Sequence, residues 1–262
     1  MPRPDVRPPA RAMILAAGLG TRLLPLTEET PKPLVEVAGH PLIAYGLGLL
    51  RAAGIGDVVV NLHHRGEQVA AALGDGRRYG MRIHYSREQT LLDTGGGIRH
   101  AAPLFDAIGA ATGGTDGPIV IANSDAISEI PIADVVRFHR ERGALVTLVL
   151  RNDPRAASYG TFDVDPTGRI RRFLGDAGPG AGLMFASLHV IERSVIERMP
   201  AGRPFGTMSE LYPALFRAGE PLYGFVYSGR WLTVDTLDDL AATEAALRRE
   251  GLPAYMRDLP LP

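Results

Sequence analysis

The chain has 262 residues, 45% of them hydrophobic and 22% charged, which suits one large α/β domain or two small ones. Its net charge of −1 excludes a strongly basic field, so we expect neither nucleic acid nor a membrane as a partner. The absence of cysteine excludes disulfides, thiolate nucleophiles and cysteine–zinc sites.

The start of the chain, residues 1–10, is rich in proline and has no apolar segment of its own. It is predicted to be a flexible tail rather than a signal peptide. No apolar run approaches the roughly 20 residues that span a bilayer. We therefore expect a cytoplasmic protein; a homo-oligomer is compatible with the sequence, which does not specify one.

From residue 11 onward, short runs rich in β-branched residues alternate with helical patterns. This alternation predicts an α/β fold, with a Rossmann-like, mainly parallel sheet flanked by helices. Right-handed crossovers place the carboxyl ends of such strands at one edge, where ligands bind. The expected order is strand 11–17, helix 41–54, strand 57–62, helix 67–73, strand 81–86, helix 96–105, strand 119–123, helix 132–143 and strand 144–150.

After residue 153 the pattern becomes more irregular and predicts a smaller mixed β/α part. The closing helix has Thr236 and Asp239 spaced for a capping box. Because no linker or repeat is visible, residues 11–251 are predicted to form one domain with halves at about 11–150 and 151–251, followed by a tail at 252–262. The expected elements are a hairpin at 160–173, a strand at 183–191, a helix at 209–219, a strand at 221–227 and a helix at 237–251.

The segment LAAGLGTRLLPLTEETPKPL, residues 15–34, is the most informative part of the sequence. Gly18 and Gly20 follow a predicted buried strand and let backbone N–H groups approach an anion. Arg22 adds a planar group that suits phosphate oxygens. Lys32, the only lysine among 28 Lys+Arg, adds a compact point charge. Together they predict a polyphosphate-binding loop at the carboxyl edge of the sheet.

Two common nucleotide-binding motifs fit this segment poorly. A Walker A loop requires G-x-x-x-x-G-K-[ST], which does not occur. A dinucleotide-binding oxidoreductase requires a third glycine where this chain has Leu23. An ordinary strand-to-loop turn remains the simple alternative for the glycines alone.

This segment resembles the signature of the sugar nucleotidyltransferases, L-A-A-G-x-G-T-R-L-x-P-L-T followed by P-K-P-L. Later segments follow the family's order: LLDTGGGIRHA (91–101), NSD (123–125), SELYPALFRAG (209–219) and WLTVDTLDDL (231–240). The resemblance covers about residues 11–250, and it is greatest to the N-acetylmuramate 1-phosphate uridylyltransferase and small mannose 1-phosphate guanylyltransferase-like branches.

The resemblance implies that a sugar 1-phosphate attacks the α-phosphorus of a nucleoside triphosphate and releases pyrophosphate, with Mg²⁺ as cofactor. In this interpretation Arg22, Lys32 and Asp125 are the catalytic residues, and the irregular half binds the sugar. The sugar phosphate contacts are assigned to Arg172 and Glu210, although a solvated hairpin edge is the simpler and favoured explanation for Arg172. The nucleotide-binding residues are Leu15, Ala16, Ala17, Gly18, Gly20, Thr21, Asp93, Gly95, Gly96 and Gly97.

The magnesium site departs from the family pattern, in which one aspartate lies in N-G-D and another in W-x-D. Asp125 is present after Ser124, but Thr233 occupies the second position, and Asp235 stands where glycine is usual. Either Asp235 substitutes as a metal ligand, or Mg²⁺ is held by Asp125, water and substrate phosphates. A simpler role for Asp235 is that of an acid beside a helix N-terminus.

The expected function is therefore synthesis of a nucleotide sugar, first of all from UTP and N-acetylmuramate 1-phosphate for a cell wall. Mannose or glucose 1-phosphate with GTP, UTP or dTTP is the alternative within the same class. Thr233 and Ser124 favour a different alternative, a catalytically impaired regulatory protein that binds nucleotide sugars.

Overall fold

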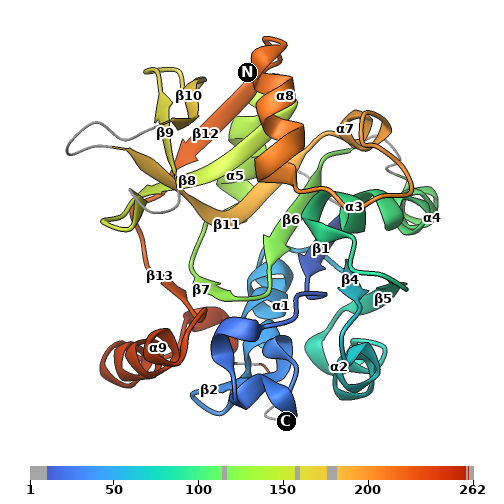
Figure 1. The fold of residues 1–262 in the computed structure, drawn as a ribbon, viewed down its shortest axis with the longest axis vertical. Coiled ribbons are helices and arrows are strands. Elements are labelled where there is room, and N and C mark those ends of the chain that lie inside the picture. Colours follow the sequence, from blue (N-terminus) through green and yellow to red (C-terminus); the bar gives the residue numbers. More distant parts are fainter. Residues whose placement is uncertain (1–10, 114–116, 157–159, 176–181, 258, 260–262) are drawn as a thin grey trace.

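The computed structural model describes residues 11–113, 117–156, 160–175, 182–257 and 259, and Figure 1 shows their arrangement. Within these residues nine strands form one sheet, with buried side chains packed on both of its faces. The tail predicted at residues 1–10 lies outside the described part. No helix in the described ranges has the length and hydropathy needed to cross a membrane.

The first half of the chain builds the parallel part of the sheet, in the order β5-β4-β1-β6. Every pairing among these strands is parallel, so their carboxyl ends meet at one edge, as predicted. The strands are β1 (Arg11–Leu15), β4 (Asp57–Leu62), β5 (Arg82–Arg87) and β6 (Ile119–Asn123). The accompanying elements are η1 (Thr21–Leu23), η2 (Leu26–Glu28), η3 (Lys32–Leu34), β2 (Glu36–Val37), β3 (His40–Pro41), α1 (Leu42–Ala52), α2 (Gly66–Leu73), η4 (Arg77–Tyr79), α3 (Asp93–His100) and α4 (Ala102–Thr112).

The second half extends the sheet with mixed pairing around β11 (Leu183–Ile191), which runs antiparallel to β6, β8 and β9. The other strands of this half are β8 (Val146–Asn152), β9 (Thr161–Val164), β10 (Ile170–Gly175) and β12 (Leu222–Val226). A separate two-stranded sheet pairs β7 (Ala126–Ser128) with β13 (Trp231–Thr233). The helical elements are α5 (Ile132–Glu141), α7 (Arg193–Glu197), the π-helical turn η5 (Thr207–Leu211), α8 (Tyr212–Arg217), α9 (Leu237–Glu250) and η6 (Ala254–Met256).

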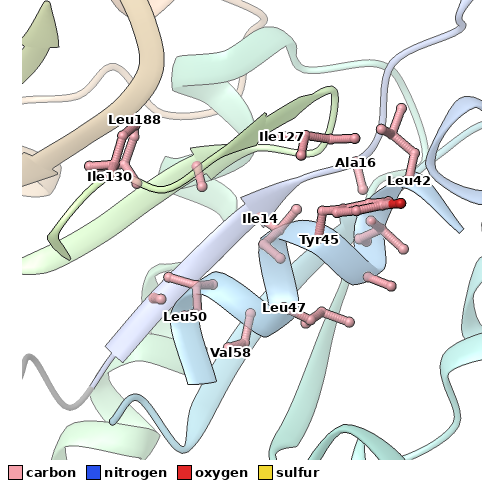
Figure 2. Packing of buried hydrophobic residues seen from close by; sticks show 14 of the residues in the cluster. Ile14, Ala16, Leu42, Tyr45, Leu47, Leu50, Val58, Ile127, Ile130 and Leu188 are labelled. Atoms are coloured by element: carbon pink, nitrogen blue, oxygen red, sulfur yellow. The ribbon is translucent and has the colours of Figure 1, made fainter. Parts of the chain in front are cut away.

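The core lies in two layers because side chains alternate between the two faces of each central strand. Ile14 of β1 and Val58 of β4 pack with Tyr45 of α1 on one face, as Figure 2 shows. Met13 belongs to the opposite layer, together with Phe105 of α4. The apolar runs of the parallel strands therefore contribute side chains to both core layers. The carboxyl edge of the sheet is held in place because helices pack on both of its faces.

Most predicted elements are confirmed, including the hairpin at residues 160–173 and the capping box of Thr236 and Asp239. The helix predicted at 96–105 is wrong in its bounds. Helix α3 begins at Asp93 and includes the glycines, and α4 begins separately at Ala102. Pro103 in the first turn of α4 lacks a backbone N–H, which suits the start of a helix but not its interior.

The predicted tail at residues 252–262 is also wrong for the described residues of that segment. Met256 and Leu259 are buried in the core. Tyr255 donates a hydrogen bond from its hydroxyl to the Ser128 carbonyl at 2.8 Å. A Cβ on Gly48 of α1 would lie 2.8 Å from side-chain atoms of both Leu259 and Tyr255, so a glycine in α1 makes room for this segment.

A buried histidine in β11 predicts an acid-dependent loss of stability. His189 is fully enclosed between Phe185 and Tyr212, and burial lowers its pKa to about 3. Between that value and the unfolded pKa of about 6.5, the unfolded chain binds a proton that the folded chain does not. The contribution of His189 is therefore complete above about pH 6.5 and decreases as the pH falls, by about 1.4 kcal/mol per pH unit.

The variant His189→Leu should flatten this part of the stability profile, because leucine does not titrate. The measurement is the free energy of unfolding in urea for both proteins at pH 7 and pH 5. The difference between them should shift in favour of the variant at pH 5. Parallel profiles for the two proteins would show that His189 does not carry the acid dependence.

Candidate active site

In the loop after β1, the stem of the Lys32 side chain packs directly against the backbone of Gly20. Gly20 has a φ of 67°, and a Cβ there would lie 3.0 Å from the Lys32 Cβ and 3.1 Å from the Thr27 Cγ2. The Thr27 hydroxyl donates a hydrogen bond to the Gly20 carbonyl at 2.9 Å. Glycine is needed here because a side chain would oppose both the positive φ and the approach of the lysine stem.

Lys32 is held between two carboxylates. Its Nζ donates to Asp125 Oδ2 and to Asp235 Oδ1, each at 2.8 Å, and its side chain is only 12% exposed. Arg22 Nη2 donates to the same Asp235 oxygen at 3.0 Å. Burial disfavours the charged ammonium, but the two carboxylates outweigh this effect and raise the pKa of Lys32. The ammonium therefore remains charged throughout the neutral range.

The small β7–β13 sheet brings Asp125 and Asp235 together. Asp125 lies between β6 and β7, and the pairing of Thr233 with Ala126 places the end of β13 beside it. Val234 N donates to the Asp125 carbonyl at 3.0 Å, and Thr233 Oγ1 donates to the same oxygen at 3.4 Å. The hydroxyl of Thr233 is therefore hydrogen-bonded to the backbone of Asp125, while the carboxylate that reaches Lys32 belongs to Asp235, two residues further along the chain.

The N-terminus of α9 is closed by a capping box of Thr236 and Asp239, so the side chain of Asp235 is not needed as a cap. Asp239 Oδ2 accepts hydrogen bonds from the backbone N–H of Thr236 at 3.0 Å and of Asp235 at 3.3 Å. The side chain of Asp235 points instead to Lys32 and Arg22. Its carboxylate is thus part of the site rather than the cap of the helix.

A cavity of about 570 Å³ opens above this cluster at the carboxyl edge of β1, β4 and β6. Asn61 of β4, which was not among the predicted site residues, also lines it. The predicted site residues that line the cavity are Leu15, Ala16, Ala17, Gly18, Gly20, Thr21, Arg22, Lys32, Asp93, Asp125 and Asp235.

The predicted glycines of α3 do not line this cavity. A Cβ on Gly95 would lie 2.1 Å from the Phe205 ring, and one on Gly96 would lie 3.1 Å from the Arg203 carbonyl. Close packing against the segment before η5 requires these glycines, so the prediction that they, with Gly97, line the nucleotide site is not supported by their position. Asp93, at the start of α3, has a φ of 60° and faces the cavity.

Arg172 and Glu210 lie outside both this cavity and the second one described next. Arg172 pairs with Asp163 across the β9–β10 hairpin, at 2.9 Å. Glu210 pairs with Arg203 on the surface. Both side chains are thus engaged in ion pairs away from the cavity walls, and the structure does not bring them to the lysine cluster.

A second cavity of about 360 Å³ adjoins the first one and shares Arg22, Asn123, Asp125 and Asp235 with it. Its walls come from β9, β11, η5 and β13, elements far apart in the sequence, and for this reason sequence reasoning missed them. Arg155 lies over the Trp231 ring, at 5.1 Å from its centroid. The remaining lining residues are Phe162, Met184, Phe185, Ser187, Met208, Ser209 and Thr233.

The donor set fits a magnesium ion. Mg²⁺ prefers oxygen ligands and is usually bound by one or two carboxylates together with waters and phosphates. Asp125 and Asp235 both lie within 2.8 Å of one ammonium, so their oxygens already converge on a single cation. The described residues contain no group of three or more His, Asp or Glu side chains suited to a metal.

Comparison with known proteins gives a family and two well-covered relatives. The nucleotidyl transferase family model matches residues 11–250. Mannose-1-phosphate guanylyltransferase of Mycobacterium tuberculosis is 35% identical over 247 residues, which are 93% of this chain and 66% of that protein. N-acetylmuramate alpha-1-phosphate uridylyltransferase of Neisseria meningitidis serogroup B is 34% identical over 242 residues, 90% of this chain and 97% of that protein. The chain thus spans about two thirds or less of the length of some relatives, such as the one from Mycobacterium tuberculosis, and nearly all of the length of the one from Neisseria meningitidis.

The fold has solved counterparts. A Bacillus anthracis protein whose structure contains sucrose superposes with a TM-score of 0.79, over 94% of this chain and 98% of that one. The two sequences are 18% identical, so this likeness concerns the fold alone. It confirms the predicted α/β class with a mainly parallel central sheet.

Proposed function

The chain belongs to the nucleotidyl transferase family, and on this premise we propose that it joins a nucleoside triphosphate to a sugar 1-phosphate, with release of pyrophosphate. The observation that carries the proposal is the position of Lys32. Its ammonium lies between Asp125 and Asp235 where the two cavities meet. One cavity then holds the triphosphate and the other the sugar, with the reacting phosphates beside Lys32.

The chemistry requires positioning and charge more than it requires a base. A phosphomonoester has a second pKa of about 6, so the attacking oxygen is already anionic at neutral pH. That oxygen forms a bond to the α-phosphorus while the bond from the α-phosphorus to the bridging oxygen breaks, and the electron pair leaves with pyrophosphate. Lys32 and Arg22 neutralise the charge that accumulates on the phosphate oxygens.

Asp125 and Asp235 are the residues that would hold magnesium. When bound, the ion supplies positive charge to phosphate oxygens. The two carboxylates raise the pKa of Lys32 in spite of its burial, and this keeps cationic charge in the site throughout the neutral range. The polypeptide itself positions the triphosphate through the backbone of residues 16–21, which lines the first cavity.

For the substrate pair we propose UTP and N-acetylmuramate 1-phosphate. The second cavity is mainly apolar, with Phe162, Met184 and Trp231 on its walls, which suits the methyl groups of an N-acetyl and a lactyl substituent. Arg155 also lines this cavity; its guanidinium already donates to both carboxylate oxygens of Asp153, at 2.9 and 3.1 Å, so a lactyl carboxylate would have to share or displace that partner. The relative from Neisseria meningitidis supports this choice, and the one from Mycobacterium tuberculosis supports mannose 1-phosphate with GTP as the alternative.

The decisive experiment is pyrophosphate release in the presence of magnesium. UTP, GTP, dTTP and ATP are each combined with the 1-phosphates of N-acetylmuramate, N-acetylglucosamine, mannose and glucose. We expect one pair to dominate, and UTP with N-acetylmuramate 1-phosphate to be that pair. Dominance of a plain hexose would overturn the substrate assignment but not the reaction. No release with any pair, together with a rise in melting temperature on adding nucleotide sugars, would favour a regulatory binding protein.

A further inference from the structure

A buried carboxylate, Glu88, connects two loops that both line the first cavity. Glu88 directly follows β5 and is 6% exposed. Its Oε1 accepts a hydrogen bond from Asn61 Nδ2 at 2.7 Å, and its Oε2 accepts one from Leu92 N at 3.0 Å. Asn61 Oδ1 in turn accepts from Ala16 N at 2.8 Å. A continuous chain of hydrogen bonds therefore runs from Ala16 to Leu92.

The two ends of this chain lie at the cavity. Ala16 lines it in the loop after β1, and the two neighbours of Leu92, Leu91 and Asp93, line it as well. The distance between these loops is thus set through the side chains of Asn61 and Glu88. Because the side chains of Asn61 and Glu88 are buried, and the hydrogen bonds from Ala16 to Asn61 and from Asn61 to Glu88 are buried as well, the connection is stiffer than a surface contact.

The identity of each residue in this connection has a chemical reason. Both carboxylate oxygens of Glu88 face donors, and a carboxylate is an acceptor at both oxygens, whereas a glutamine would present one donor. No cation is paired with Glu88 in the described part of the chain, so its burial depends on these hydrogen bonds. Gly97 makes room for them, because a Cβ there would lie 2.7 Å from Glu88 Oε1 and 2.9 Å from Asn61 Nδ2.

We propose that Glu88 is a positioning residue that, through Asn61, fixes the separation of residues 15–20 and 91–94 and so prepares the cavity for the nucleotide. This inference rests on the proposed function of the cavity. Glu88 itself does not touch substrate. Its loss should therefore weaken nucleotide binding, seen in KM for the triphosphate, far more than it changes kcat.

The test is a cycle of three variants, Glu88→Gln, Asn61→Asp and the double variant. Each single change leaves two like groups facing one another: two donors in the first case and two carboxylates in the second. In the double variant, the carboxylate introduced at position 61 accepts from Ala16 N and from the amide introduced at position 88. The oxygen of that amide accepts from Leu92 N. Every hydrogen bond is then restored with the charge moved to position 61.

We expect each single variant to raise KM for the triphosphate by about tenfold or more, with kcat within about threefold of the parent. The double variant should recover most of the loss. Glu67→Gln, an exposed glutamate on α2, is the matched control and should leave KM unchanged. A Glu88→Gln variant with unchanged KM, or a double variant no better than the worse single one, would overturn the proposal.

Hydrogen exchange gives a readout that does not depend on catalysis. The peptides that contain Ala16 and Leu92 should lose protection in each single variant and regain it in the double variant. If no substrate pair reacts, this exchange pattern still decides the positioning role, while the proposed function fails separately. Unchanged protection in both single variants would show that the connection does not hold the loops.

Discussion

Replacement of Lys32 by alanine is expected to lower kcat by about 10²- to 10³-fold, the typical effect of removing one preorganised charge from an active site. The side chain is buried and already held at 2.8 Å from two carboxylates, so little reorganisation is needed when phosphates bind. Its removal would also leave Asp125 and Asp235 facing the substrate phosphates without the ammonium between them. Turnover is measured as pyrophosphate release at saturating substrates.

Two further variants sharpen this test. Lys32→Arg keeps the charge but replaces a compact ammonium with a wide guanidinium in a crowded site, so we expect it to remain strongly impaired. Near-native turnover of this variant would refute the argument from shape. Arg77→Ala removes an exposed cation paired with Asp75 far from the cavity and should change nothing. A loss below about threefold in Lys32→Ala would refute the role of the lysine itself.

Removal of either carboxylate at the lysine is the second large expected effect. Asp125→Ala should abolish magnesium-dependent turnover, and Asp235→Asn should reduce kcat by about 10²-fold, because each removes a charge that would bind the ion. Both rates are measured across a magnesium titration, in which an impaired site requires more metal. Asp238→Asn is the matched control, since Asp238 is an exposed acid three residues further along, in the first turn of α9.

A double variant tests whether the second carboxylate has moved along the chain. Thr233→Asp with Asp235→Gly restores the W-x-D-x-G-T pattern of the sugar nucleotidyltransferases. In the family pattern the metal-binding carboxylate stands at the position of Thr233. If Asp235 provides that carboxylate in this chain, the double variant should recover the turnover that Asp235→Asn loses. If Asp235→Asn behaves like Asp238→Asn, Asp235 has no catalytic role and the metal depends on Asp125 alone.

The glycine-rich loop that lines the first cavity could be located from the sequence because its determinants are local. Gly18, Gly20, Arg22 and Lys32 lie within one short segment, and each residue type has its own chemical reason to be there. The order of strands and helices could be predicted for the same reason, since hydrophobic periodicity over a few residues indicates which face of a strand or helix is buried. The differences were boundaries that depend on packing, such as the start of α3, and the described residues of segment 252–262, which pack on the core instead of forming a tail.

Contacts between distant segments were decided by the tertiary structure alone. Asp235 reaches Lys32 because β13 pairs with β7, while Thr236 and Asp239 form the capping box of α9 without it. Arg172 forms an ion pair with Asp163, and Glu210 forms one with Arg203. The local sequence pattern did not predict these two ion pairs.

The sequence by itself determined the α/β class and located the glycine-rich loop and the lysine that line the first cavity. The walls of the second cavity and the connection from Ala16 to Glu88 exist only in the folded chain. The physical reason is that backbone propensity and side-chain periodicity act over a few residues. The direction of a buried carboxylate, in contrast, is set by donors that the fold brings from far along the chain.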